Sequence, residues 1–325
     1  MKKVFVGLFF SLGGLYLAFR QIDLKNLSFV FSTIKWFPII FASLAILVSV
    51  WIRAIRWKLI LRPIKDLDTH SLFGAAMIGY FGNSILPLRL GELMRAYALK
   101  RNAVSMSVAF GTLIVERTLD MIGLMILIFV LFFSYDIPFW LLRSGIFLSG
   151  FVLIASVLLF WIAFKHDQWL KIFGSSDFFQ KGMQRKLLDI FKSFVIGLST
   201  LRKVNKIKTI VFHSVLLWAI YWLITFLCVY ATGIKLSFLE VGIVMVAVTM
   251  IIVLPAAPGF IGTYHAGAVM ILIEVFGVSQ APAQAYAIIN HAVGFLPLAV
   301  IGAIYFFRSS MTFEQVKSIK ISPSP

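Results

Sequence analysis

The sequence predicts an all-α polytopic membrane protein, with about six spanning helices and two broken or re-entrant helical hairpins arranged as an inverted repeat. Of its 325 residues, 61% are hydrophobic and 13% are charged, whereas soluble domains average about 45–50% and about 25%. The mean hydropathy is +0.97. Apolar runs close to the length of a spanning helix, about 20 residues, recur at Val4–Phe19, Trp36–Ile52, Thr118–Tyr135, Phe139–Phe164, Thr209–Thr232 and Gln284–Phe307.

The order of basic segments gives an orientation for these spans. Val4–Phe19 follows Lys2-Lys3 without a small-x-small cleavage site, so we interpret it as an uncleaved first helix. Basic residues collect in cytoplasmic loops, and the segments 53–70, 165–208 and the tail after Arg308 are all basic. We therefore expect a protein of the cytoplasmic (inner) membrane with both termini in the cytoplasm.

Two regions do not fit simple spans. Leu72–Leu88 has 17 residues, contains Asn83, and is followed by the short run Ala103–Val115. The region 239–277 is apolar on both sides of a Pro- and Gly-rich break. Such breaks persist in hydrocarbon only where protein or a water-filled cavity surrounds them. Each region is a re-entrant hairpin or a pair of short spans, and the expected break residues are Pro87, Gly91, Pro255, Pro258, Gly259 and Gly262.

The layout divides one transmembrane domain, residues 1–325, into two similar halves. Residues 36–135 contain the first broken pair, 72–115, and residues 209–307 contain the second, 239–277. The helix at 139–164 reverses the second half, which is the inverted-repeat layout of many transporters. The basic cytoplasmic segment 165–208 has apolar residues at helical spacing, which fits an interfacial helix or a helix packed on the ends of the spans.

Charged side chains at membrane depth are the candidate binding residues, because each costs about 2.5–3.5 kcal/mol at a helix centre. Arg89, Glu92 and Arg95 share a face at a spacing of three, and Glu116 and Asp120 share a face around Arg117. Arg89 or Arg95 are the expected partners of these carboxylates. The set either neutralises itself and fixes helix packing, or its arginines bind an anionic headgroup, since guanidinium matches phosphate bidentately.

Tyr264 and His265 follow the second break, and Asn290 and His291 lie in the last span. These are satisfied core residues or a second part of the site. No pair has a metal-ligand spacing, so we expect neither metal nor cofactor. No nucleophile elbow, P-loop or dinucleotide fingerprint is present, which favours a protein that is not an enzyme. The net charge of +17 is a topology signal and not a nucleic-acid footprint.

These motifs resemble the flippase-like family typified by the transmembrane region of lysylphosphatidylglycerol synthase. The resemblance rests on the pattern from Asn83 to Arg95, on Glu116-Arg117-x-x-Asp120, on Pro255 to His265 and on Asn290-His291. It implies an integral membrane protein that moves or handles polar lipids, with anionic phospholipid or polyprenyl-phosphate lipid as partner and a soluble synthase as a candidate partner. Tyr264-His265 stand where many synthases have an Arg-Glu pair, which points to a different sub-branch.

Three functions therefore remain open. The first is a flippase-like transporter of anionic or polyprenyl-linked polar lipids. The second is a membrane enzyme or accessory subunit of lipid-linked glycan or aminoacyl-lipid synthesis, and the third is a scaffold without catalysis. For the transporter, the expected headgroup-binding residues are Asn83, Arg89, Glu92, Arg95, Glu116, Arg117, Asp120, Tyr264, His265 and His291.

Overall fold

The computed structural model describes residues 12–20, 22–86, 90–102, 104–165, 168, 192, 194–200, 206–253, 258–309 and 311–312. Pro87, Arg89 and Pro255 therefore lie outside the described residues, as does most of the basic segment 165–208. Every regular element in the described part is a helix, so the predicted all-α class is confirmed.

Residues 12–19 are helical. After them come α2 (Leu24–Ser32), α3 (Trp36–Leu61), α4 (Thr69–Ile85), α5 (Gly91–Ala98), the 3-10 turn η2 (Leu99–Asn102), α6 (Met106–Ser134), α7 (Phe139–Phe164), α10 (Ile207–Ala231), α11 (Phe238–Val253), the 3-10 turn η4 (Pro258–Phe260), α12 (Thr263–Glu274) and α13 (Gln280–Arg308).

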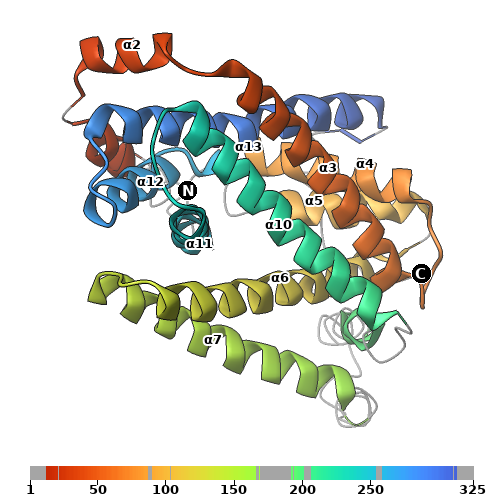
Figure 1. Ribbon diagram of the computed structural model, residues 1–325. Coiled ribbons are helices and arrows are strands. Elements are labelled where there is room, and N and C mark those ends of the chain that lie inside the picture. The colour runs from red at the N-terminus through yellow and green to blue at the C-terminus, as the bar shows by residue number, and fades with distance from the viewer. Residues whose placement is uncertain are drawn as a thin grey trace.

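The long helices run across the view of Figure 1, with α3 beside α10 and α6 beside α7. The loop after α3, the start of α10 and the end of α13 lie at one end of the molecule, and the connections α6–α7 and α12–α13 lie at the other. The helix α11 is seen nearly end-on, so it crosses the long helices at a steep angle.

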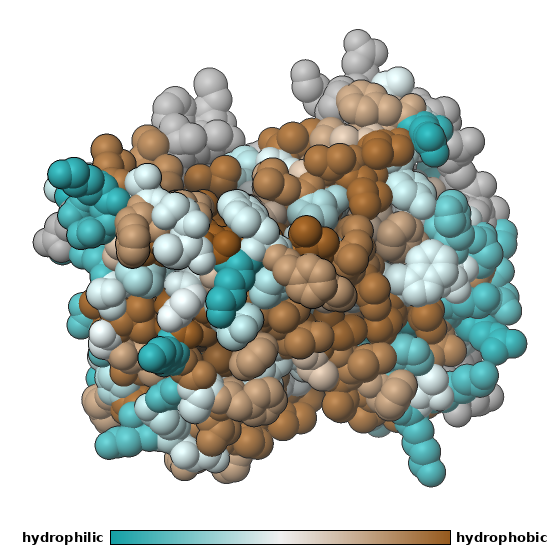
Figure 2. All heavy atoms as spheres, turned by 45° about the horizontal axis from the view of Figure 1, so that its top comes forward, coloured by the Kyte–Doolittle hydropathy of each residue, from teal (hydrophilic) through white to brown (hydrophobic). Residues whose placement is uncertain are grey.

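Apolar side chains cover the outside of this bundle. Phe147 of α7 is 79% exposed, and similar side chains line α3, α10 and α13. Figure 2 shows hydrophobic residues across the middle of one face, with hydrophilic residues gathered towards its two sides. Within the described residues, four helices are long and apolar enough to cross a membrane, namely α3, α7, α10 and α13.

Two helices extend further than the sequence indicates. The predicted span Trp36–Ile52 continues to Leu61, so Arg53 and Arg56 belong to α3 and are buried, not part of a cytoplasmic loop. The run Ala103–Val115 is not a separate short element, because α6 joins it to the next span in one helix of 29 residues. In α3, buried charges that the sequence assigned to a cytoplasmic loop therefore lie inside a continuous helix.

The first broken region is a tight antiparallel pair, α4 and α5. A Cβ on Gly91 would lie 2.0 Å from the backbone oxygen of Gly79, and a Cβ on Gly82 would lie 2.7 Å from Cα of Gly91. Asn83 accepts a hydrogen bond from the Gly91 N–H at 2.9 Å. Glycine is thus required at this contact, and Asn83 closes the hairpin by bonding across its tip.

The second broken region pairs α11 with α12. Gly267 packs against Ile251, where a Cβ would lie 2.3 Å from the isoleucine Cδ1. The loop between the helices includes Gly259 and Gly262, both with positive φ (67° and 93°), and Phe260, a non-glycine residue at φ 58°. The expected break residues Pro258, Gly259 and Gly262 therefore do interrupt the helix.

Gly14 in the N-terminal helix meets the same loop. A Cβ at Gly14 would lie 2.6 Å from the carbonyl carbon of Gly262, so the two backbones are in direct contact. The Gln284 side chain of α13 adds a hydrogen bond to the Ala18 carbonyl at 2.8 Å. The N-terminal helix is thus fixed to the second half at two places.

Candidate functional site

Buried ion pairs connect α3, α5 and α6. Glu116 of α6 is fully buried. Its carboxylate accepts hydrogen bonds from Nη1 and Nη2 of Arg95, one on each oxygen, at 3.0 and 2.9 Å. It also accepts a hydrogen bond from Nη1 of Arg53 at 2.8 Å. Arg95 also lies over the ring of Trp57, 4.0 Å from its centroid. The bidentate pairing and the aromatic contact hold Arg95 in one orientation.

Asp120 lies one turn further along α6 and extends the network. Its Oδ2 accepts from Arg53 at 2.7 Å and its Oδ1 accepts from Arg56 at 2.6 Å. Arg117 donates to Glu92 of α5 at 2.5 Å and to Asp120 at 3.4 Å. The side chain of Arg117 is 31% exposed, against 5% or less for the other three arginines, so it is the accessible cation of this group.

The described network has a positive excess. Four arginines, Arg53, Arg56, Arg95 and Arg117, meet the three carboxylates of Glu92, Glu116 and Asp120, which leaves a net charge of +1. The Nε atoms of Arg53, Arg56 and Arg95 are buried without a hydrogen-bond partner. Buried cations of this kind favour a compensating anion.

A second group of polar side chains surrounds the loop between α11 and α12. His291 of α13 donates through Nε2 to the Gly259 carbonyl at 2.7 Å. Asn290 donates to the hydroxyl groups of Tyr264 and Tyr286. The rings of His265 and His291 lie with their centroids 4.7 Å apart, and His291 stacks on Phe295. These contacts hold the loop between α11 and α12 to α13 through neutral groups.

One cavity of about 340 Å³ joins the two groups. Arg53, Glu92, Arg117 and Asp120 line it on the charged side, and Thr249, Phe260, Tyr264, Asn290 and His291 line it around the second loop. Tyr80, Asn83, Trp218, Tyr221 and Phe295 are also on its wall. Ligand cavities in proteins commonly have about 300–1,000 Å³ and combine apolar walls with a few polar groups. This cavity has both properties.

The cavity includes six of the predicted binding residues, namely Asn83, Glu92, Arg117, Asp120, Tyr264 and His291. Arg95 and Glu116 lie in the ion-pair network next to it, and His265 packs on His291 beside it, but none of the three is on its wall. The carboxylates are paired by Arg53 and Arg56 as well as by the expected Arg95.

The sequence reasoning missed Arg53, Tyr80 and Tyr221 as wall residues. Tyr221 accepts a hydrogen bond from Arg53 at 2.9 Å. The spacing of the buried residues Arg53, Arg56, Trp57 and Ile60 is helical, and this was the available signal that α3 continues.

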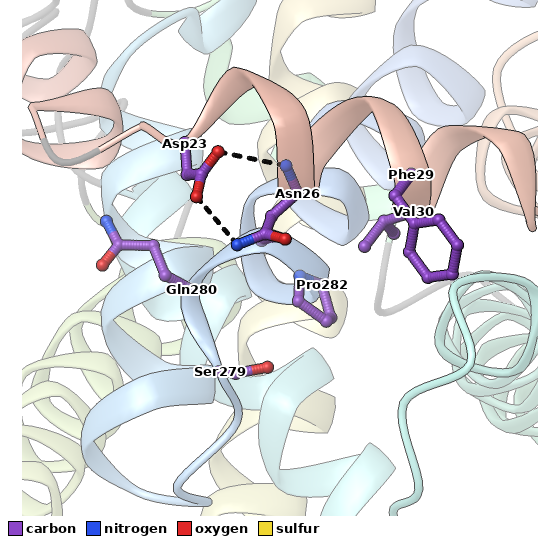
Figure 3. A pocket seen from close by; sticks show the side chains of 8 residues that line it. Asp23, Asn26, Phe29, Val30, Ser279, Gln280 and Pro282 are labelled. Atoms are coloured by element: carbon purple, nitrogen blue, oxygen red, sulfur yellow. Dashed lines mark hydrogen bonds between the residues drawn. The ribbon is translucent and has the colours of Figure 1, made fainter.

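A second pocket, of about 320 Å³, lies between α2 and the start of α13 (Figure 3). Asp23 caps α2 by accepting from the Asn26 backbone at 3.1 Å and from its side chain at 2.8 Å. Gln280 and Pro282 form the opposite wall. Asp23 is thus engaged in capping. Within the described ranges, no group of three His, Cys, Asp or Glu residues is placed to hold a metal ion.

The family model for the lysylphosphatidylglycerol synthase transmembrane region matches residues 4–302. The chain belongs to this family. Membership connects the chain with membrane lipids and, together with the apolar helices, makes it an integral membrane protein.

The curated proteins to which the chain is similar are also described as membrane proteins. A UPF0104 membrane protein of Methanothermobacter thermautotrophicus is 26% identical over 79% of this chain and 82% of its own length. UPF0104 membrane proteins of Methanocaldococcus jannaschii and Pyrococcus horikoshii are 25% and 22% identical, over 70% and 83% of this chain and 93% and 87% of their own lengths. No solved structure matches the chain significantly.

Proposed function

We propose that the protein is a flippase-like transporter that moves an anionic or polyprenyl-linked polar lipid across the cytoplasmic membrane. The observation that carries this proposal is the cavity of about 340 Å³, which joins buried arginines to the loop of the second hairpin inside an apolar bundle. A lipid headgroup needs a polar path through hydrocarbon, and this cavity supplies polar groups at membrane depth.

Arg117 and Arg53 are the headgroup-binding cations of the proposal. Both line the cavity, and Arg117 keeps 31% of its side chain exposed. Glu92 and Asp120 hold Arg117 in place through its two terminal nitrogens. Arg95 and Glu116 act as positioning residues, because they fix Arg53 and the α5–α6 contact from outside the cavity. Arg89 belongs to the same proposed site.

The two hairpins are the proposed moving parts. The helices α4 and α5 have 17 and 8 residues, about 26 and 12 Å, whereas the hydrocarbon core is about 30 Å thick. We propose that α4–α5 and α11–α12 are re-entrant, enter from opposite sides and belong to inverted halves, 36–135 and 209–307. Their tips are close to each other, since α4 contacts η4. Alternate opening of the halves would expose the cavity to each side in turn.

Arg117→Gln tests the site. The protein is reconstituted in vesicles containing phosphatidylglycerol labelled on an acyl chain with nitrobenzoxadiazole, and dithionite reports the label that reaches the outer leaflet. We expect at least a tenfold lower rate for Arg117→Gln than for wild type, because the accessible cation is lost. Arg62→Gln is the matched control, since Arg62 pairs with Asp66 at the surface. Equal rates for wild type and a folded Arg117→Gln protein contradict the proposed site.

Cysteine labelling tests the orientation. The native Cys228 is fully buried, so the wild-type background is silent towards a charged maleimide. We expect Asp66→Cys, in the α3–α4 loop, to react only from the cytoplasmic side of intact cells or oriented vesicles. Asp136→Cys, between α6 and α7, is expected to react only from the outside. Labelling of both positions from one side contradicts the proposed topology.

A further inference from the structure

We propose that the headgroup accepted by this cavity is a phosphodiester joined to an uncharged, hydroxyl-rich group, and not to an ammonium-bearing aminoacyl group. This inference rests on the proposed function and names its substrate class. It follows from the difference between the two ends of the cavity.

The charged end fits a phosphodiester. The described network of four arginines and three carboxylates has a net charge of +1, to which Arg89 of the proposed site adds a further positive charge, so this end favours a phosphodiester anion. Arg117, whose side chain is 31% exposed, and Arg53 both line the cavity here. Tyr80 and Asn83 are further polar residues on the cavity wall.

The other end offers hydrogen bonds without negative charge. Its wall includes Thr249, Tyr264, Asn290 and His291. Asn290 lies on the cavity wall and donates its amide N–H groups to Tyr264 and Tyr286. Hydroxyl groups both donate and accept and match such a wall. Phe295, which stacks on His291, and Phe260 supply apolar faces beside these groups.

An ammonium group has no charge partner at this end. The carboxylates on the cavity wall, Glu92 and Asp120, belong to the charged end and are paired with arginines there, although Oε2 of Glu92 accepts no hydrogen bond. The titratable groups that face His291 are His265 and Tyr264; a histidine is neutral or positive, so neither protonation state of this pair balances a cation. The sequence segments 87–89 and 254–257, which lie outside the described residues, contain one arginine and no acidic residue. A buried cation without a partner is costly.

Headgroup selectivity of the full chain in vesicles tests the inference. Acyl-labelled phosphatidylinositol, phosphatidylglycerol, lysylphosphatidylglycerol and phosphatidylcholine are compared by the dithionite assay. A polyprenyl-phosphohexose arm is followed by access of periodate to the sugar. We expect the lipids with hydroxyl-rich uncharged headgroups to move at least tenfold faster than the two ammonium-bearing lipids. The faster of the glycerophospholipid and polyprenyl arms identifies the source of the headgroup.

Asn290→Asp supplies the missing negative charge. We expect it to lower the ratio of phosphatidylinositol to lysylphosphatidylglycerol rates at least tenfold. Gln280→Glu is the matched control, an amide-to-acid change on the same helix but outside the cavity, and it should leave the ratio unchanged. If Asn290→Asp does not fold, the ratio of phosphatidylinositol to lysylphosphatidylglycerol rates of the wild-type protein alone tests the inference about the headgroup.

Two failures are distinguishable. If lipids move but lysylphosphatidylglycerol moves as fast as phosphatidylinositol, the inference about the headgroup is wrong and the proposed translocation stands. If purified, folded protein moves none of the lipids, the proposed translocation is wrong and the inference falls with it.

Discussion

Glu116→Gln is the substitution that most directly tests whether the ion-pair network is a charged, tightly coupled unit. The change keeps the size of the side chain and removes one negative charge at a fully buried position. Glu116 accepts three hydrogen bonds from Arg53 and Arg95. With glutamine, the net charge of the described network rises from +1 to +2, and an amide N–H group must face a guanidinium.

The expected loss of stability is about 3–5 kcal/mol, the range found when one partner of a buried ion pair is removed. This corresponds to a decrease in the apparent unfolding temperature on the order of 10 °C. Tryptophan fluorescence on heating the detergent-purified protein measures it, and Trp57 beside Arg95 is a local reporter. Glu274→Gln is the control, because Glu274 is exposed, and it should change the temperature by less than about 2 °C.

The double variant Glu116→Gln/Arg95→Gln separates charge balance from packing. Removing Arg95 returns the network to +1, so we expect the double variant to be more stable than Glu116→Gln alone, with a coupling of about 0.5–3 kcal/mol. If Glu116→Gln unfolds within 2 °C of wild type, or if the double variant is simply the sum of the single ones, then the reasoning about a coupled buried network is refuted.

Two further predictions concern local structure. Gly91→Ala should cost about 2–3 kcal/mol of stability by overpacking against the Gly79 carbonyl. Gly150→Ala, inside α7 with open space around it, should instead stabilise by up to about 1 kcal/mol; equal unfolding temperatures for the two variants would contradict the tight α4–α5 contact. Asp68→Ala should remove the cap of α4 and cost about 1 kcal/mol. Hydrogen bonds from Ser71 hold the pKa of Asp68 below its ordinary value, so this difference is present above about pH 4 and shrinks as the pH falls through the folded-state pKa. The unfolding temperatures of wild type and Asp68→Ala, measured between pH 3 and 7 at intervals of about one pH unit, report this difference. A difference that grows on acidification contradicts the assignment of Asp68 as the cap.

Hydropathy alone located the helices whose ends are marked by charge or proline. The span Phe139–Phe164 was predicted to the residue, because Pro138 and Lys165 bound a run in which Arg143 is the single charged residue. The hydrophobic composition also sufficed to predict a polytopic membrane protein. The loops at both hairpins were predicted from Pro and Gly, since those residues alter the backbone directly.

The same reasoning failed where charges are buried inside a helix. Arg53 and Arg56 looked like the start of a loop, because a hydropathy average does not distinguish a charge in water from a charge paired with a carboxylate 63 or 64 residues away. The partner of Arg53 lies on α6, and one sequence contains no signal for such a pairing. Consequently the sequence predicted that the site contains arginines and carboxylates, but it did not identify Arg53, the buried arginine on the cavity wall.

The contact between Gly14 and Gly262 gives the N-terminal helix an influence that its position in the chain does not suggest. The loop that begins at Pro258 includes a wall of the cavity, and the carbonyl of Gly259 is held by His291. Gly14 contacts this loop at Gly262, the residue directly before α12 begins, so the N-terminal helix supports the loop by packing against it. Fusion partners or bulky substitutions in the N-terminal helix are therefore expected to alter the shape of the cavity, and a tag for purification belongs at the other terminus.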